Sequence, residues 1–294
     1  MNKPTILSCG EVLWDLFPNG ARFGGAPANF ACHAAMLGGQ VSMLSGVGND
    51  ARGDDALSIL NRFHVDTSLI QRIADAPTGS VGVTIDDPTK PAFEIHTNSA
   101  WDNIAWTAEL ESRIAQFDAV YFGTLGQRGE LSRATIRHVI QTAKARGILR
   151  VLDVNLRKPF YDAELLRESI SQASVLKLSD EELFEVAAAC DIAWHASSEI
   201  VLRQILTRFK LDLVVMTRGA EGAILLSATE LILQPGIPTV VRDTVGAGDS
   251  FTAALVIGLL RGDALATIAR TACETASAVC KHDGAVPEIP LPIL

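Results

Sequence analysis

Residues 118–154 read DAVYFGTLGQRGELSRATIRHVIQTAKARGILRVLDV, and this stretch carries the clearest structural signal of the chain. Asp118–Gly123 is a short apolar run of the kind found in buried strands. Leu131–Ala145 then carries apolar residues at helical spacing and stops before Gly147, a plausible helix end. A second apolar run follows at Leu149–Val154. A strand, a helix and a strand in this order predict two parallel strands joined by a helix.

The same alternation continues towards the C-terminus. A helix is predicted through Leu165, Leu166 and Ile170, a strand at Val175–Leu178, helices at Glu181–Ala188 and Ile200–Phe209, and strands at Leu213–Thr217 and Ala223–Leu226. The sequence therefore predicts an α/β fold whose mainly parallel sheet carries helices on its faces. We expect one catalytic domain over residues 1–294.

Two stretches break the alternation. Leu13–Phe23 has a turn at Pro18–Gly20, and Thr78–Ala100 reads as two strands around a turn at Asp86–Pro91. Neither stretch is accompanied by a helix. They predict a small β-sheet that stands off the main sheet, at about residues 13–23 and 78–100, and that could serve as a lid.

Composition excludes several classes of protein. The formal net charge of −9 argues against a nucleic-acid-binding surface, which needs clustered Lys and Arg. No uninterrupted apolar stretch reaches the roughly 18 residues of a membrane span, and the first residues do not resemble a signal peptide. The 5 cysteines are scattered and odd in number, which favours reduced thiols in a cytoplasmic protein.

The most informative motif is RDTVGAGDSF, Arg242–Phe251. The apolar run Ile237–Val241 before it predicts a strand, and Phe251–Leu260 after it predicts a helix. The glycines let the backbone approach a ligand closely, and the first N–H groups of a helix lack intrahelical partners. The backbone of Gly246, Ala247 and Gly248 could therefore form an anion hole for a phosphoryl group, with Asp249 placed to accept a hydroxyl proton. The alternative is a simple glycine turn in which Asp249 caps the helix.

Three motifs together resemble the ribokinase-like, phosphofructokinase-B type carbohydrate kinases: DTVGAGDSF at Asp243–Phe251, GGAPAN at Gly24–Asn29, and GVGNDARGDDAL at Gly46–Leu57. Their order and spacing fit along nearly the whole chain. GEVLWD at Gly10–Asp15, DVNLR at Asp153–Arg157 and KLSDEE at Lys177–Glu182 look like the fructokinase and ketodeoxygluconate kinase branch. The resemblance implies a three-layer αβα sandwich with a small β-sheet lid.

The resemblance also implies roles for individual residues. Asp249 would be the base, and Asp15, Gly25 and Asn29 would hold sugar hydroxyls. Asn98, in the expected lid, and Arg157 are further candidates for sugar contact. Ser179, Thr217, Gly219 and Gly248 would line the ATP phosphates; many family members carry Asn where Ser179 stands. Glu182 would order Mg²⁺ through water, while Asp243, Val245 and Gly284 would border a monovalent cation, usually K⁺.

These motifs leave several functions open. The leading expectation is an ATP-dependent fructokinase that makes fructose 6-phosphate, working as a homodimer through its lid. The nearest rival is a kinase for 2-keto-3-deoxygluconate, whose carboxylate would need a positive charge such as Arg157. Kinases for ribose or nucleosides are weaker alternatives, and a catalytically silent sugar sensor is the alternative that is not an enzyme. ATP consumption on addition of sugar would separate an enzyme from a sensor.

Overall fold

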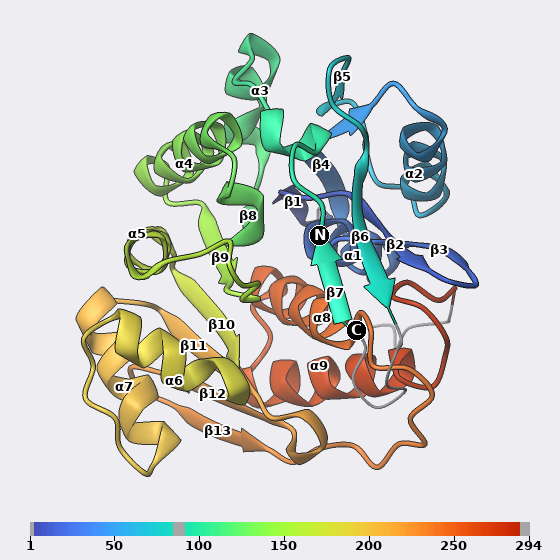
Figure 1. Ribbon diagram of the computed structural model, residues 1–294. Helices are drawn as coiled ribbons and strands as arrows, with labels where there is room; N and C mark the ends of the chain where they lie inside the picture. Colours follow the sequence, from blue (N-terminus) through green and yellow to red (C-terminus); the bar gives the residue numbers. More distant parts are fainter. Residues whose placement is uncertain (1–2, 85–91, 289–294) are drawn as a thin grey trace.

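The main sheet is nine-stranded in the computed structural model, which describes residues 3–84 and 92–288. Its strands are β1 (Thr5–Cys9), β4 (Gln40–Gly48), β5 (Ile70–Ile73), β8 (Ala119–Gly123), β9 (Leu149–Asp153), β10 (Val175–Ser179), β11 (Leu213–Thr217), β12 (Ala223–Ser227) and β13 (Leu231–Gln234). They lie in the order β13-β12-β11-β10-β9-β8-β1-β4-β5 (Figure 1). Neighbours from β5 to β11 pair in parallel, whereas β12 pairs antiparallel with both of its neighbours, β11 and β13. The predicted mainly parallel sheet is confirmed.

Helices cover both faces of this sheet (Figure 1). They are α1 (Ala26–Met36), α2 (Ala51–Arg62), α3 (Ala108–Arg113), α4 (Glu130–Ala145), α5 (Ala163–Gln172), α6 (Asp180–Ala189), α7 (Ser198–Phe209), α8 (Ala247–Arg261) and α9 (Leu265–Val279). Side chains alternate along each strand, so Val120 and Phe122 of β8 join the core under α3–α7, while Ala119 and Tyr121 join the core under α1, α2, α8 and α9. The three-layer architecture follows from these two cores. No helix in the described ranges has the length and apolarity to cross a bilayer.

A second, smaller sheet is built from the two stretches that break the alternation. Its strands are β2 (Leu13–Phe17), β3 (Gly20–Gly24), β6 (Gly79–Thr84) and β7 (Ala92–Ile95), in the order β3-β2-β6-β7. Two antiparallel pairs, β2–β3 and β6–β7, are joined by parallel pairing of β2 with β6. The expected small sheet is thus present, although the predicted turn at Asp86–Pro91 lies outside the described residues.

The strand predicted at Ile237–Val241 is wrong. This segment has no regular secondary structure, and the last strand of the sheet is β13. Pro238 has no N–H to give to a ladder, and Val240 and Val241 are 89% and 57% exposed. The apolar run is an irregular surface connection that leads into the glycine loop.

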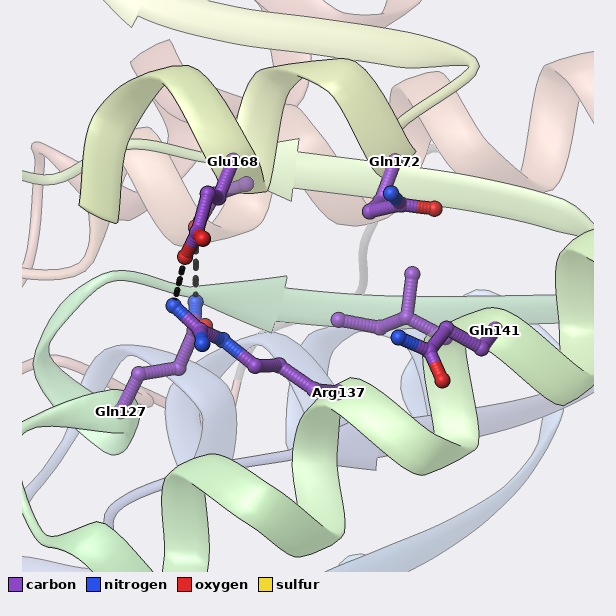
Figure 2. Close-up of a pocket in the computed structure, with 7 residues that line it drawn as sticks. Gln127, Arg137, Gln141, Glu168 and Gln172 are labelled. Carbon is purple, nitrogen blue, oxygen red and sulfur yellow. Dashed lines mark hydrogen bonds and ion pairs between the residues drawn. The ribbon is translucent and has the colours of Figure 1, made fainter. Parts of the chain in front are cut away.

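A small polar cavity lies between α4 and α5 (Figure 2). Arg137 and Glu168 form an ion pair across it, and the Gln127 amide donates to the Gly123 carbonyl and to the Ser169 hydroxyl. These helices cover the face of the sheet opposite α8. The cavity is therefore part of helix packing and is separate from the glycine loop.

The Arg128 side chain links two parts of the chain. One is the segment that follows β7 of the small sheet, and the other is the loop that follows β8, where Arg128 itself lies. Its guanidinium donates to both carboxylate oxygens of Asp102, at 2.8 and 2.9 Å, and to the His96 carbonyl at 2.7 Å. It also lies between two aromatic rings, 3.8 Å from the centroid of Trp101 and 4.7 Å from that of Phe160. The Arg128 and Asp102 side chains are only 6% and 13% exposed, so each buried charge is compensated mainly by the opposite charge of its partner.

We predict that Arg128→Met lowers the free energy of unfolding by roughly 3–5 kcal/mol, because Asp102 would keep a buried charge without a partner. Arg137→Met is the matched control. It breaks a partly exposed ion pair with Glu168 and should cost about 1 kcal/mol or less. Urea unfolding followed by circular dichroism measures both losses. Equal losses would contradict the role given to Arg128.

Candidate active site

The glycine loop opens helix α8 with unpaired backbone donors. Gly246 is the N-cap at φ 80°, and a side chain there would bring its Cβ within 2.1 Å of the Ala285 carbonyl oxygen. The Ala247 N–H donates to the Thr244 carbonyl at 3.2 Å. In the described part of the chain, no backbone acceptor faces the N–H groups of Gly248 and Asp249. These two N–H groups are free to bind an anion at the positive end of the helix. The part predicted for the backbone of Gly246 and Ala247 in an anion hole stays a prediction.

Asp249 stands in the same first turn. Its Oδ2 accepts a 2.9 Å hydrogen bond from the Asn29 amide, which comes from the first turn of α1. Burial raises the pKa of Asp249 to about 6; Asn29 opposes this shift and Asp153 adds to it. The Asp249 carboxyl group therefore loses its proton close to neutral pH, as the role predicted for it requires.

Helix α1 begins against the same site. Its N-cap, Gly25, has φ 104°, and a Cβ there would lie 2.5 Å from the Glu11 carbonyl oxygen. Only glycine fits this close approach. The two glycine motifs, far apart in sequence, thus bring the starts of α1 and α8 together through the Asn29–Asp249 hydrogen bond.

The other predicted residues gather at the carboxyl ends of the parallel strands. Ser179 at the end of β10 is the register partner of Thr217 at the end of β11, so the two predicted nucleotide contacts are neighbours. Gly219 follows them with φ 51°, and the position that a Cβ would take there is open. In open α/β sheets this edge is where ligands bind.

Arg157 faces the predicted sugar-binding residues. It is exposed, and its guanidinium lowers the pKa of three carboxyl groups, those of Glu11, Asp15 and Asp249. Burial still leaves the pKa of Asp15 above its ordinary value, against the pull of Arg157 and Arg22. Asp15 and Arg22 are paired across the β2–β3 hairpin. Arg157 and Asp15 therefore belong to one charged cluster with Asp249.

Asn98 does not join this cluster in any hydrogen bond of the structure's described residues. It lies in an exposed turn after β7, with φ 56°. Its predicted contact with sugar stays a prediction.

The residues predicted to border a monovalent cation do lie together. Asp243 Oδ1 accepts from the Val245 N–H and Oδ2 from the Gly284 N–H, each at 3.0 Å, so one carboxylate joins two loops. Carboxylate and carbonyl oxygens are suitable donors for K⁺. The arrangement fits the expected ion, and its binding stays a prediction.

Glu182 is held firmly at the start of α6. Its Oε1 accepts from the Leu156 N–H at 2.7 Å and its Oε2 from the Ser179 N–H at 2.8 Å. A carboxylate has about four acceptor positions, so two remain for water. These open positions fit the role predicted for Glu182 in ordering Mg²⁺ through water, and that role stays a prediction. Within residues 3–84 and 92–288 no group of three His, Cys, Asp or Glu forms a metal cage.

Three buried residues of the site were not predicted from the sequence: Glu11, Tyr121 and Lys177. Glu11 is 3% exposed, and its Oε2 has no hydrogen-bond partner in the described structure. The Tyr121 hydroxyl beneath the site is likewise without one, and burial raises its pKa, helped by Asp153 and Asp249. Lys177 pairs with Asp153. For Lys177, the available signal was a charged residue within the otherwise mainly apolar run of β10.

We predict that Glu11→Gln changes how stability depends on pH. Burial raises the pKa of Glu11 from 4.5 to about 7, so the folded chain keeps this proton to higher pH than the unfolded chain does. The contribution of the Glu11 carboxyl group to the free energy of unfolding is fully present below about pH 4.5 and is lost as pH rises through about 7. Relative to Glu11→Gln, the natural chain should lose up to about 3 kcal/mol between about pH 4.5 and 8. Urea unfolding of both chains across this pH range measures the difference between their free energies of unfolding. A difference that does not change with pH would contradict the prediction.

Comparison with known proteins gives the family. Residues 19–292 match the model of the pfkB family carbohydrate kinases. Probable fructokinase-5 of Arabidopsis thaliana is 26% identical over 316 aligned residues, which cover 99% of this chain and 96% of that protein. Fructokinase of Klebsiella pneumoniae is 29% identical, covering 85% and 82% of the two chains.

Solved structures agree with the fold. An uncharacterized sugar kinase from Pyrococcus horikoshii superposes with a TM-score of 0.81 at 28% identity, over 96% of this chain and 93% of that one. A fructokinase from Vibrio cholerae, in its fructose-, ADP- and calcium-bound form, has a TM-score of 0.82 at 25% identity, over 96% and 94%. Because the family model spans nearly the whole sequence, the chain belongs to the pfkB family of carbohydrate kinases and is a sugar kinase.

Proposed function

We propose that this kinase transfers the γ-phosphoryl group of ATP to fructose and forms fructose 6-phosphate, with Asp249 as the base. One observation carries the proposal: a carboxylate with a pKa of about 6 lies in the same helical turn as two N–H groups free to bind an anion. The fructokinase relatives, at 26–29% identity, support fructose as the acceptor.

Each side chain has a place in this reaction. Asn29 holds Asp249 Oδ2, which leaves Oδ1 to take the proton of the sugar hydroxyl. Asp15 and Gly25 would fix other hydroxyls of the sugar. The Gly248 and Asp249 N–H groups would stabilise the charge on the transferring phosphoryl group. Ser179, Thr217 and Gly219 would line the ATP phosphates. Mg²⁺ beside Glu182 would supply charge neutralisation on those phosphates, and K⁺ beside Asp243 would stabilise the loop.

Further parts of the proposal concern the small sheet, the oligomeric state, the location and the number of domains. The small sheet would close over the sugar and exclude water, which would otherwise compete as acceptor. A homodimer through this sheet is supported by Phe93, which is 60% exposed on β7. A cytoplasmic location is supported by five cysteines that are all free thiols. A single domain is supported by the two cores, which share one sheet.

We predict that Asp249→Asn lowers kcat by roughly 10²–10⁴-fold, because an amide cannot accept the hydroxyl proton, while the affinity for the sugar changes little. Glu164→Gln is the matched control, since Glu164 is an exposed carboxylate in the first turn of α5. A coupled assay of ADP release measures kcat. A near-natural kcat would remove Asp249 from the role of base.

The pH dependence of the same reaction gives an independent check. A protonated Asp249 cannot act as base, so kcat/KM should fall as pH decreases through about 6.

A panel of hexoses, pentoses, sugar acids and nucleosides identifies the acceptor. Absence of ADP release with every sugar would favour a sugar sensor instead of an enzyme.

A second candidate acceptor is 2-keto-3-deoxygluconate. Arg157 favours it, since this exposed guanidinium lies among the predicted sugar contacts and could bind a carboxylate.

If the natural acceptor is the sugar acid, Arg157→Leu should lower kcat/KM for that acid about tenfold to a hundredfold, through loss of a charge-assisted hydrogen bond. If it is fructose, the same variant should change kcat/KM for fructose only a few-fold. Kinetics of both sugars with both proteins decide between them. Greater natural activity on the acid than on fructose would overturn the fructokinase assignment.

A further inference from the structure

An ion pair lies buried under the first turn of α8. Lys177 Nζ is 3.0 Å from Asp153 Oδ2 and 3.1 Å from Oδ1. The two side chains are 8% and 1% exposed. Because Lys177 and Asp153 are register partners on the neighbouring strands β10 and β9, their pairing is fixed by the sheet itself.

The pair contacts the helix that carries the base. The Thr252 hydroxyl, one turn into α8, lies 3.2 Å from Asp153 Oδ2 and 2.9 Å from the Gly248 carbonyl oxygen. The hydroxyl group of Thr252 has one proton, so it can donate to only one of these two acceptors at a time. A Cβ on Gly248 would lie 3.4 Å from Lys177 Nζ. The ammonium group is therefore directly beneath the residue whose N–H is open to an anion.

We propose that Lys177 is a positioning residue for phosphoryl transfer: its paired ammonium group neutralises the floor of the anion hole, and Asp153 and Thr252 connect it to the first turn of α8. This inference rests on the proposed function. Buried ion pairs add little net stability, so their retention beneath a catalytic turn needs another reason. Without Lys177, the Asp153 charge would oppose both an incoming phosphoryl group and an ionised Asp249.

The charges on the pair follow from their surroundings. Burial alone would lower the pKa of Lys177, but the carboxylates of Asp153 and Glu182 raise it above its ordinary value. Burial raises the pKa of Asp153, and Lys177 opposes that shift. The groups that face Asp249 from the surrounding elements are Glu11, Asn29, Tyr121, Asp153, Arg157 and Lys177. Of these, only Lys177 and Asp153 form an ion pair with each other.

This arrangement predicts shifts of opposite sign for the two single variants. Lys177→Met removes a positive charge, so the pKa of Asp249 should rise and the acid limb of kcat/KM should move to higher pH. Asp153→Asn removes a negative charge, so the limb should move to lower pH. The double variant removes both charges and should return the limb close to its natural position. Lys177→Met alone should also lower kcat at neutral pH about tenfold or more.

The test measures the three variants in two ways, with Lys144→Met as the matched control on the exposed surface of α4. The first measurement is kcat/KM against pH with the sugar that the natural enzyme phosphorylates. The second is a ¹³C NMR titration of the aspartate carboxyl groups, with the Asp249 signal assigned from Asp249→Asn. The titration needs no sugar, so it tests the ion pair even if the assignment of fructose is wrong.

The proposal would be supported if the pKa of Asp249 shifts in opposite directions in the two single variants and returns close to its natural value in the double variant. Shifts in the same direction, or no shift of the Asp249 signal, would overturn it and leave the pair a purely structural feature. If Lys177→Met fails to fold because Asp153 is left unpaired, Asp153→Asn and the double variant still decide the question. Thermal unfolding of each variant separates loss of structure from loss of charge.

Discussion

The structure depends on keeping the first turn of α8 open while placing a carboxylate in it. Free N–H groups attract negative charge, and the helix dipole adds to this attraction. Asp249 could therefore fold back and cap its own helix, which would consume the donors that a phosphoryl group needs. The Asn29 hydrogen bond at 2.9 Å holds the carboxylate towards α1 instead. That single contact keeps the proposed base and the proposed anion hole separate within one turn.

The α/β topology makes this contact possible. Asn29 and Asp249 are 220 residues apart, yet each lies in the first turn of a helix on the same face of the sheet. Gly25 and Gly246 permit the close approach, since a side chain at either position would strike a carbonyl oxygen. Residues that follow β1, β9, β10 and β11 then surround the two helix starts. The site is thus assembled from separate parts of the chain by the parallel order of the strands.

Local patterns in the sequence predicted much of this. The apolar runs of β8–β11 and the helices between them are visible because their periods differ, and the glycines of the two loops mark positions that other residues cannot occupy. The strand at Ile237–Val241 failed because apolar composition outweighed Pro238 in the prediction. Glu11 and Lys177 were missed for another reason. Spacing along the chain does not show which strands become neighbours, and the register of Lys177 with Asp153 is a property of the assembled sheet.

The charges around Arg157 bear on the proposed choice of sugar. Arg157 faces three carboxyl groups, and one of them, Glu11, has a pKa of about 7 and therefore holds its proton part of the time at neutral pH. When ionised, Asp15 and Asp249 already outnumber the single guanidinium of Arg157. A sugar acid would bring a further negative charge, which would compete with the two carboxylates for the positive charge of Arg157. A neutral ketose would leave the net charge unchanged, and its hydroxyl groups could donate to the carboxylates. By this reasoning the charges around Arg157 support the proposal of fructose rather than the sugar acid, because Arg157 offsets the repulsion between the two carboxylates.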